Sequence, residues 1–259
     1  IGRAGVLGPD GQRVLSKLAF YVASPPLLFT TISEADIHHI FSAPLLVAAA
    51  SAWLTMIAYA LLSRFVFSRD AATVVMGAQA AGQVNAANLG IPIALFVLGD
   101  ASQVAPVMLF QLAINTPLYL TIMDTLTGGR HPTAGSELKN IVTNPLIMGS
   151  ALGIMSAATG IRLPDLAMEP VRIVAGAAVP AMLLAFGLSL VGSRPLASPG
   201  ARVDTLLATG AKVVVHPGLA LLLAWALGLT GHALYAAVIM AALPTAQNLY
   251  VAAVRYDRA

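Results

Sequence analysis

The sequence predicts an all-α protein that crosses a membrane several times, and three observations support this fold class. Of the 259 residues, 58% are hydrophobic and only 10% are charged, with a mean hydropathy of +0.83. Soluble domains carry about 25% charged residues, so this composition cannot cover a surface that faces water. The apolar residues gather in runs of about 20, the length that a helix needs to cross a bilayer. Short connections rich in Gly, Pro and Ser separate these runs.

Eight such runs follow one another along the chain, and each is predicted to form one membrane-spanning helix. The longest polar segment, residues 125–137, divides the chain near its middle, and we expect it to link a first half, 1–124, to a second half, 138–259. The predicted spans are 14–33, 41–67, 71–99, 104–123, 138–160, 166–191, 203–229 and 232–256.

The positions of Lys and Arg predict the orientation, because cytoplasmic loops of membrane proteins carry an excess of both residues. If the first loop is cytoplasmic, 11 of the 14 Lys and Arg residues lie on that side, and so does the linker. Arg162 and Arg172 lie on the opposite side, and Lys212 lies within a span. The net charge of +3 therefore reflects orientation and does not indicate nucleic-acid binding. The absence of cysteine excludes disulfides and cysteine metal sites, and no metal or other cofactor is expected.

Two of the spans contain a break, at residues 85–92 and 243–248. Proline removes a backbone donor and clashes with the preceding turn, and glycine weakens a helix. Inside a bilayer, the freed backbone groups must be satisfied by protein or by a water-filled cavity. Two interrupted spans in corresponding halves of a chain therefore point to a transporter site. The candidate substrate-binding residues in the breaks are Asn85, Asn88, Gly90, Pro92, Pro244, Thr245, Gln247 and Asn248.

A faint internal repeat relates the two halves, since Pro25 and Pro180 are separated along the chain by almost the same interval as Pro92 and Pro244. Five predicted spans separate the matching elements, and an odd number inverts the second copy in the membrane. The sequence thus predicts two inverted five-helix repeats. Completing them would require one helix before Ile1 and one after Ala259, or ten in all.

The residues of the breaks favour an organic anion as the substrate. Proline is preferred in the first turn of a helix, so Pro92 and Pro244 are expected to begin the second halves of their spans. Each helix N-terminus carries about half a positive charge and free N–H donors. Such ends would make a positive site without Lys or Arg. Gln111 and Asn115, one turn apart in the next span, would complete its wall or merely bridge helices.

Acidic residues are absent from both breaks, because all 11 lie in loops or near predicted helix ends. A proton relay through buried acids is therefore unsupported, and sodium would have to bind to carbonyls and amides alone. Proton or sodium coupling stays open. Lys212 and His216, one turn apart inside a span, are candidates for coupling or support. The alternative is that Lys212 reaches the cytoplasmic face with its long side chain.

Several motifs resemble the auxin efflux carrier family, which includes bacterial dicarboxylate and malonate permeases and the plant PIN-type carriers. Asn88-Leu89-Gly90-Ile91-Pro92 and Ala242-Leu243-Pro244-Thr245-Ala246 are similar to the crossover helices of that family. The resemblance covers nearly the whole chain. The other matching stretches are 1–7, 144–149 and 160–164.

The resemblance implies two inverted five-helix repeats in which the fourth and ninth helices cross. It implies a transport domain, here 41–123 and 203–256, that moves against a dimerising scaffold, here 14–33 and 138–191, so a homodimer is expected. In the plant carriers a glutamine lines the substrate pocket, and Gln111 falls where it would. The bacterial inner membrane is the expected location.

The leading expectation is therefore a secondary transporter, not an enzyme, that moves a small organic anion such as a carboxylate by alternating access. A sodium-coupled symporter of the bile-acid type is the alternative, since it shares this architecture. A retinal photoreceptor that uses Lys212 is a remote alternative, because no counter-ion acid lies within the spans. An intramembrane protease is equally remote, since Asp100 has no second aspartate in reach.

Overall fold

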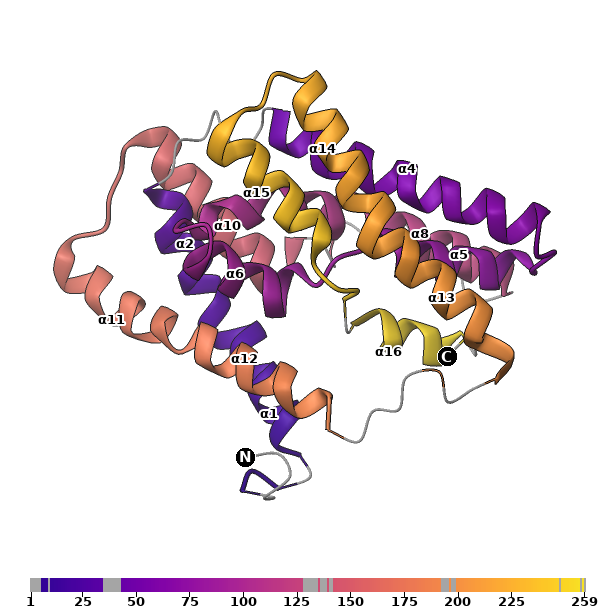
Figure 1. Cartoon of the computed structure of the whole chain (residues 1–259). Coiled ribbons are helices and arrows are strands. Elements are labelled where there is room, and N and C mark those ends of the chain that lie inside the picture. The colour runs from indigo at the N-terminus through magenta and orange to yellow at the C-terminus, as the bar shows by residue number, and fades with distance from the viewer. Residues whose placement is uncertain are drawn as a thin grey trace. The chain divides into compact units, whose positions relative to one another are not determined.

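The computed structural model describes residues 6–8, 10–34, 43–127, 135, 139, 142–191, 196, 199–246, 248–256 and 258. Regular structure in this part of the chain is helical, and strand pairing is limited to one isolated bridge (Figure 1). The predicted all-α class is thereby confirmed. The α-helices are α1 (Gly11–Leu18), α2 (Ser24–Ser33), α4 (Ala43–Phe65), α5 (Ala71–Gly82), α6 (Ile91–Phe96), α7 (Ala105–Leu109), α8 (Thr116–Leu126), α10 (Pro145–Thr159), α11 (Asp165–Gly176), α12 (Ala178–Ser189), α13 (Arg202–Gly210), α14 (His216–Ala226), α15 (Gly231–Ala242) and α16 (Asn248–Arg255).

Wider π-helical turns join several of these helices, and each of them ends two residues before a proline. Proline has no N–H and its ring crowds the preceding turn, so the chain before it widens to keep its hydrogen bonds. Two short 3₁₀ turns, η3 (Ala101–Val104) and η5 (Pro199–Ala201), precede α7 and α13. The π turns are η1 (Ala19–Ala23), η2 (Ala86–Gly90), η4 (Phe110–Asn115) and η6 (Ala211–Val215), which precede Pro25, Pro92, Pro117 and Pro217.

Among the described residues, five continuous helices are long and apolar enough to cross a membrane, and shorter apolar helices accompany them. Large apolar side chains such as Trp225, Leu222 and Val214 lie exposed on the outside of one of these helices. An apolar surface of this kind suits lipid and not water. The protein is therefore an integral membrane protein. The five long helices are Gly11–Ser33, Ala43–Phe65, Ala101–Leu126, Asp165–Ser189 and Arg202–Ala226.

The chain forms two compact units, and the first consists of residues 1–41, 87–105 and 139–194. Within it α2 packs along α10, while α1 packs against α12. A Cβ atom at Gly149 would overlap the backbone of Pro25, so glycine lets α2 and α10 approach closely. Asn144 caps α10, since its side-chain oxygen accepts hydrogen bonds from the N–H of Leu146 at 3.0 Å and of Ile147 at 3.4 Å. Asparagine is among the residues preferred at the N-cap position.

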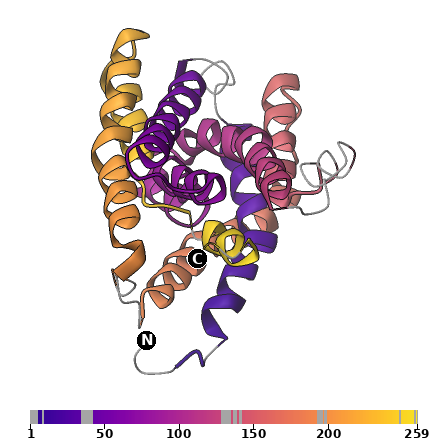
Figure 2. The ribbon, with the colours of Figure 1, turned by 90° about the vertical axis from the view of Figure 1, so that its right-hand side faces the viewer.

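The second unit consists of residues 42–86, 106–138 and 195–259. In this unit α4 packs along α5, and α14 packs against α4 and α15. Figure 2 shows α13, η6 and α14 as one continuous helix, coloured orange. The interior of the second unit is apolar. Met56 and Phe110 belong to one buried cluster, and Met123 and Leu249 belong to another. Both breaks predicted from the sequence begin within this unit.

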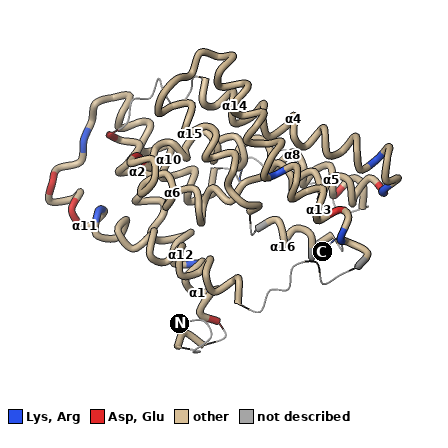
Figure 3. Tube along the Cα trace, in the orientation of Figure 1, with Lys and Arg blue, Asp and Glu red and all other residues tan. Residues whose placement is uncertain are grey.

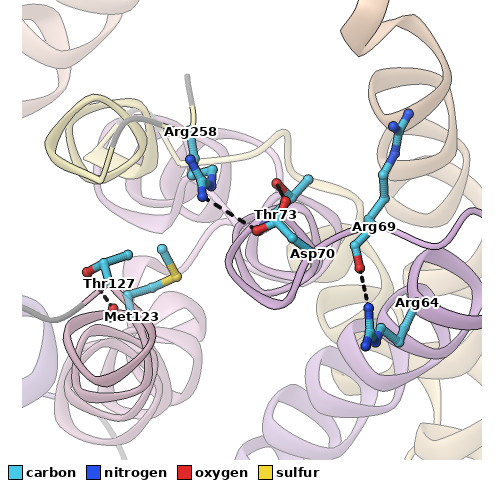
Figure 4. A network of polar contacts seen from close by, with 7 residues as sticks. All are labelled: Arg64, Arg69, Asp70, Thr73, Met123, Thr127 and Arg258. Atoms are coloured by element: carbon cyan, nitrogen blue, oxygen red, sulfur yellow. Dashed lines mark hydrogen bonds and ion pairs between the residues drawn. The ribbon is translucent and has the colours of Figure 1, made fainter.

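Charged residues of this unit gather at one end, where α4 ends and α5 and α13 begin (Figure 3). Arg69 forms a two-pronged ion pair with Asp204, with nitrogen–oxygen distances of 3.0 and 3.1 Å. Arg258 lies 3.5 Å from Asp70, and the Arg64 guanidinium donates to the carbonyl of Arg69 at 2.9 Å (Figure 4). These contacts tie three segments together outside the apolar spans.

Asp70 caps α5 at this end of the unit. Its carboxylate accepts hydrogen bonds from the Thr73 hydroxyl at 2.6 Å and from the Thr73 N–H at 3.2 Å (Figure 4). The hydroxyl hydrogen bond is the main cause that lowers the pKa of Asp70 below its usual value, and Arg258 adds to it. The cap therefore holds its negative charge at the positive end of α5.

Candidate functional site

The first break lies at residues 83–85, where the chain is extended between the end of α5 and the start of η2. The prediction that this span is interrupted is correct, although the break lies at 83–85 and was expected over 85–92, and the expectation that Pro92 begins the second half of the span is wrong. Pro92 lies inside the continuous helical segment Ala86–Phe96, in the first turn of α6. A proline needs no N–H partner there, so it widens the preceding turn without ending the helix.

The second break lies after α15, where residues 243–246 leave the helical path before α16 begins at Asn248. The expectation that Pro244 begins the second half of this span is also wrong. Pro244 belongs to the non-helical segment, and its carbonyl serves as an acceptor there. Gln247 lies outside the described residues, and of Asn248 only the place in the helix is described.

The two breaks pair with each other inside the second unit. Val84 and Thr245 form an isolated antiparallel bridge, and the N–H of Asn85 donates to the carbonyl of Pro244 at 2.7 Å. The Thr245 hydroxyl donates to the carbonyl of Ala80, near the end of α5, at 2.7 Å. Backbone groups that lose helical partners in a bilayer need such replacements. The pairing therefore supplies hydrogen-bond partners to backbone groups of both breaks, so that the membrane-embedded structure can contain them.

Gln111 completes the first break from η4. Its side-chain oxygen accepts from the N–H of Val84 at 2.7 Å, and its side-chain nitrogen donates to the carbonyl of Val84 at 3.1 Å. Four residues later, the Asn115 amide donates to the side-chain oxygen of Gln79 on α5 at 2.7 Å. Both side chains are buried. The sequence left open whether Gln111 and Asn115 complete the wall of the site or bridge helices. The structure shows that both amides bridge segments of the chain.

Gln83 is a polar residue of the break that the sequence reasoning missed. Its side chain is only 2% exposed, and its Oε1 has no hydrogen-bond partner among the described residues. A buried polar atom without a partner costs about 1–3 kcal/mol, so proteins keep few of them without a functional reason. Its signal in the sequence is an amide two positions before Asn85 within an apolar run.

The structure brings some of the predicted site residues together and separates others into the first unit. Asn85, Gln111, Asn115, Pro244 and Thr245 all belong to the second unit. Asn88, Gly90 and Pro92 follow the break and belong to the first unit, where Gly90 and Pro92 are buried.

Lys212 and His216 lie one turn apart, on η6 and at the start of α14. The Lys212 Nζ is 3.4 Å from the His216 Nδ1, and their side chains are 3% and 2% exposed. The alternative in which Lys212 extends to the membrane surface is therefore excluded. None of the ion pairs between described residues includes either side chain. Within the same described ranges, no three His, Cys, Asp or Glu side chains gather as metal ligands.

Comparison with known proteins adds an independent line of evidence. A family model described as "Membrane transport protein" matches residues 1–259. The chain is 27% identical over 252 residues to a protein of Rhizobium meliloti (strain 1021) named "Putative malonate transporter", covering 93% of this chain and 77% of that protein. It is also 27% identical over 258 residues to an "Uncharacterized transporter" of Methanothermobacter thermautotrophicus (strain ATCC 29096 / DSM 1053 / JCM 10044 / NBRC 100330 / Delta H), covering 98% of this chain and 82% of that protein.

Proposed function

The chain belongs to the membrane transport protein family, which is the auxin efflux carrier family that its motifs resemble, and we propose that it is a secondary transporter of a small carboxylate. In this proposal the carboxylate binds at the paired breaks, and the site opens alternately to the two sides of the membrane. The observation that carries the proposal is the hydrogen bond from Asn85 to Pro244, which joins the two interrupted spans.

The chemistry of the breaks supports an anionic substrate. Each paired segment leads within a few residues into a new helical segment, at Ala86 and at Asn248. A helix start offers N–H donors and about half a positive charge to an anion. The segments 83–86 and 243–248 contain amides but no acidic or basic residue. A carboxylate would therefore meet donors and no repelling charge.

A dicarboxylate is the substrate class that we propose to test first. The name of the Rhizobium meliloti relative refers to malonate. The amides of Gln83 and Asn85 would select such an anion, because an amide can present its nitrogen to a carboxylate oxygen. Both side chains are buried beside the bridge of Val84 and Thr245.

The division of the chain into two units supports separate scaffold and transport roles. The first unit contains both ranges expected to form the dimerising scaffold, and the second contains most of the ranges expected to form the transport domain. Residues 87–105 depart from this division, since they cluster with the first unit. We propose that the first unit mediates a homodimer and that the second carries the paired breaks. The gathering of Arg64, Arg69 and Arg258 at one end of the second unit supports a cytoplasmic location of that end.

Exchange of radiolabelled malonate by the full chain in proteoliposomes tests this function. Vesicles loaded with unlabelled malonate should take up labelled malonate faster than protein-free vesicles. External succinate or acetate should reduce this uptake to the extent that each one fits the binding site. Substituting Asn85 with Ala should abolish exchange while the protein still elutes as a single folded species. Exchange by none of these carboxylates would overturn the proposal. A requirement for sodium over potassium would instead favour the bile-acid type of symporter.

A further inference from the structure

The second unit buries a lysine and a histidine side by side, and neither belongs to the paired breaks. Lys212 and His216 are both almost inaccessible, and their nitrogens lie 3.4 Å apart. Among the described residues, no carboxylate forms an ion pair with either one. A buried ammonium without an anion is strongly disfavoured in a membrane protein, so such groups mark function by default.

The surroundings of the pair are apolar or neutral. The turn η6 packs against α4, α5, α13, α14 and α15. Tyr59 packs in the same cluster as Ala208 and Ala211, so its neutral phenol lies beside this turn. The described polar partners of Arg64, Asp70 and Asp204 are other residues at the charged end of the unit. The titratable side chains on the packed elements are Tyr59, Arg64, Arg202, Asp204, His232 and Tyr235, and Asp70 caps α5.

A pair with this geometry holds one proton and not two. Two positive charges at 3.4 Å repel strongly where little water screens them. With one proton added, the Lys212 ammonium donates to the Nδ1 of neutral His216. Without it, the neutral amine donates to the same atom, since an amine keeps N–H groups. The hydrogen bond survives in both states, so the pair changes charge by one without losing its geometry.

We propose that Lys212 and His216 together bind one transported proton, which makes the transporter a proton–carboxylate symporter. The inference rests on the proposed function, because the carboxylate supplies the compensating charge. The turn η6 packs against α5 and α15, the two helices that end at the paired breaks. A protonated pair lacks an anion when the carrier is empty, and a bound carboxylate provides one. Proton and carboxylate therefore bind together, and both leave together on the other side of the membrane.

Malonate uptake into proteoliposomes under an imposed pH gradient tests the inference, with the membrane voltage held at zero by potassium and valinomycin. One pH unit, acidic outside, should drive about a tenfold accumulation of malonate when one proton accompanies it. A pH-sensitive dye inside the vesicles should report acidification that depends on malonate. Protein-free vesicles correct for passive leak of the protonated acid.

Lys212→Arg is the diagnostic variant, because an arginine side chain keeps its charge at every accessible pH. With a permanent charge, the empty carrier cannot return, so net uptake driven by the pH gradient should disappear. Exchange of internal for external malonate needs only the loaded carrier and should continue. A residue that only maintained the fold would not separate these two activities. Lys212→Met, which removes the charge without adding bulk, should leave any residual uptake independent of the gradient.

His232→Gln is the matched control, since His232 lies exposed at the start of α15 and should leave gradient-driven uptake unchanged. Each variant is first shown to elute and unfold as the unaltered protein does. Exchange by the unaltered protein without any response to the pH gradient would overturn proton coupling and leave the transporter assignment standing. Gradient-driven uptake by Lys212→Met would overturn it as well. Loss of exchange in Lys212→Arg would show that the lysine binds the carboxylate directly and would also overturn it. Absence of exchange in the unaltered protein would overturn the proposed function itself.

Discussion

The backbone N–H of Asn85 donates a 2.7 Å hydrogen bond to the carbonyl of Pro244, although the two residues lie in opposite halves of the chain. Each residue sits where an apolar span stops being helical. Bilayer-embedded helices satisfy their own backbone groups, so a hydrogen bond between two such interruptions replaces what each helix has lost. The two interruptions thus form one structural feature, and a substitution in either interruption should affect the structure of both.

Replacing Gln83 with Leu should separate stability from function. The side-chain oxygen of Gln83 is buried without a partner among the described residues, so an apolar side chain should raise the free energy of unfolding or leave it unchanged. Malonate exchange should nevertheless be lost. Thermal unfolding in detergent and proteoliposome exchange measure the two effects. Gln79→Leu is the comparison, because it breaks the hydrogen bond to Asn115 and should lower stability. A Gln83→Leu protein that still exchanges malonate would remove Gln83 from the site.

Replacing Gln111 with Leu should destabilise the fold, because it removes the acceptor of the Val84 N–H and one of two donors to the Val84 carbonyl, which also accepts from the Ala86 N–H. Leaving the buried N–H of Val84 unpaired should cost about 1–3 kcal/mol. The midpoint of thermal unfolding should fall accordingly. Gln103→Leu is the control, since Gln103 is less buried and bonds only to Asp100 in a neighbouring turn. An equal loss of stability in both variants would argue against a special role of Gln111 at the break.

Replacing Gly149 with Ala should weaken the packing of α2 against α10. The added methyl group would overlap the backbone of Pro25, which cannot move aside as a flexible side chain can. Overpacking of this kind typically costs about 1–3 kcal/mol. Gly187→Ala provides the control, because open space surrounds a Cβ there. Since alanine favours helices over glycine, the control should be neutral or slightly stabilising. Unfolding midpoints that fall by the same amount in both variants would contradict the close approach.

Replacing Pro217 with Ala should alter proton coupling more than stability. The π turn η6 ends two residues before Pro217, and restoring an N–H at that position permits ordinary helical hydrogen bonds. The turn would then tighten and rotate Lys212 away from His216. We expect malonate uptake to lose its response to a pH gradient, with an unfolding midpoint that is equal or higher. Pro170→Ala within α11 is the control and should retain the response. A normal pH response in Pro217→Ala would show that the widened turn is dispensable.

Replacing Thr73 with Val should change the stability in a pH-dependent way. The Thr73 hydroxyl lowers the pKa of Asp70 in the folded protein. A lowered folded-state pKa adds stability that is fully present above the unfolded pKa of about 3.9 and is lost as pH falls through the lower folded value. The unaltered protein should therefore unfold at a higher temperature than Thr73→Val at neutral pH. The two should converge under acid conditions. Because Asp70 is largely exposed, the difference should be small, and a difference that grows on acidification would be contrary to this mechanism.

Much of the fold follows from local sequence patterns. The eight apolar runs correspond to the continuous or interrupted helices of the structure, and Asn144 caps α10 at a position that asparagine prefers. The two runs expected to be interrupted are the two that break, at 83–85 and 243–246. Composition and periodicity suffice for these features, because length and hydrophobicity alone decide whether a segment suits a bilayer.

The position of each break and the partners of its backbone were decided by tertiary contacts. The second halves of the two spans were expected to begin at Pro92 and Pro244, but the first span leaves the helix where Gln111 and Pro244 supply replacement hydrogen bonds to Val84 and Asn85. A helical N–H is given up only where another acceptor is within reach, and that acceptor comes from a distant segment. The sequence by itself therefore determined which spans are interrupted, whereas the packing of distant helices chose the residues at which they open.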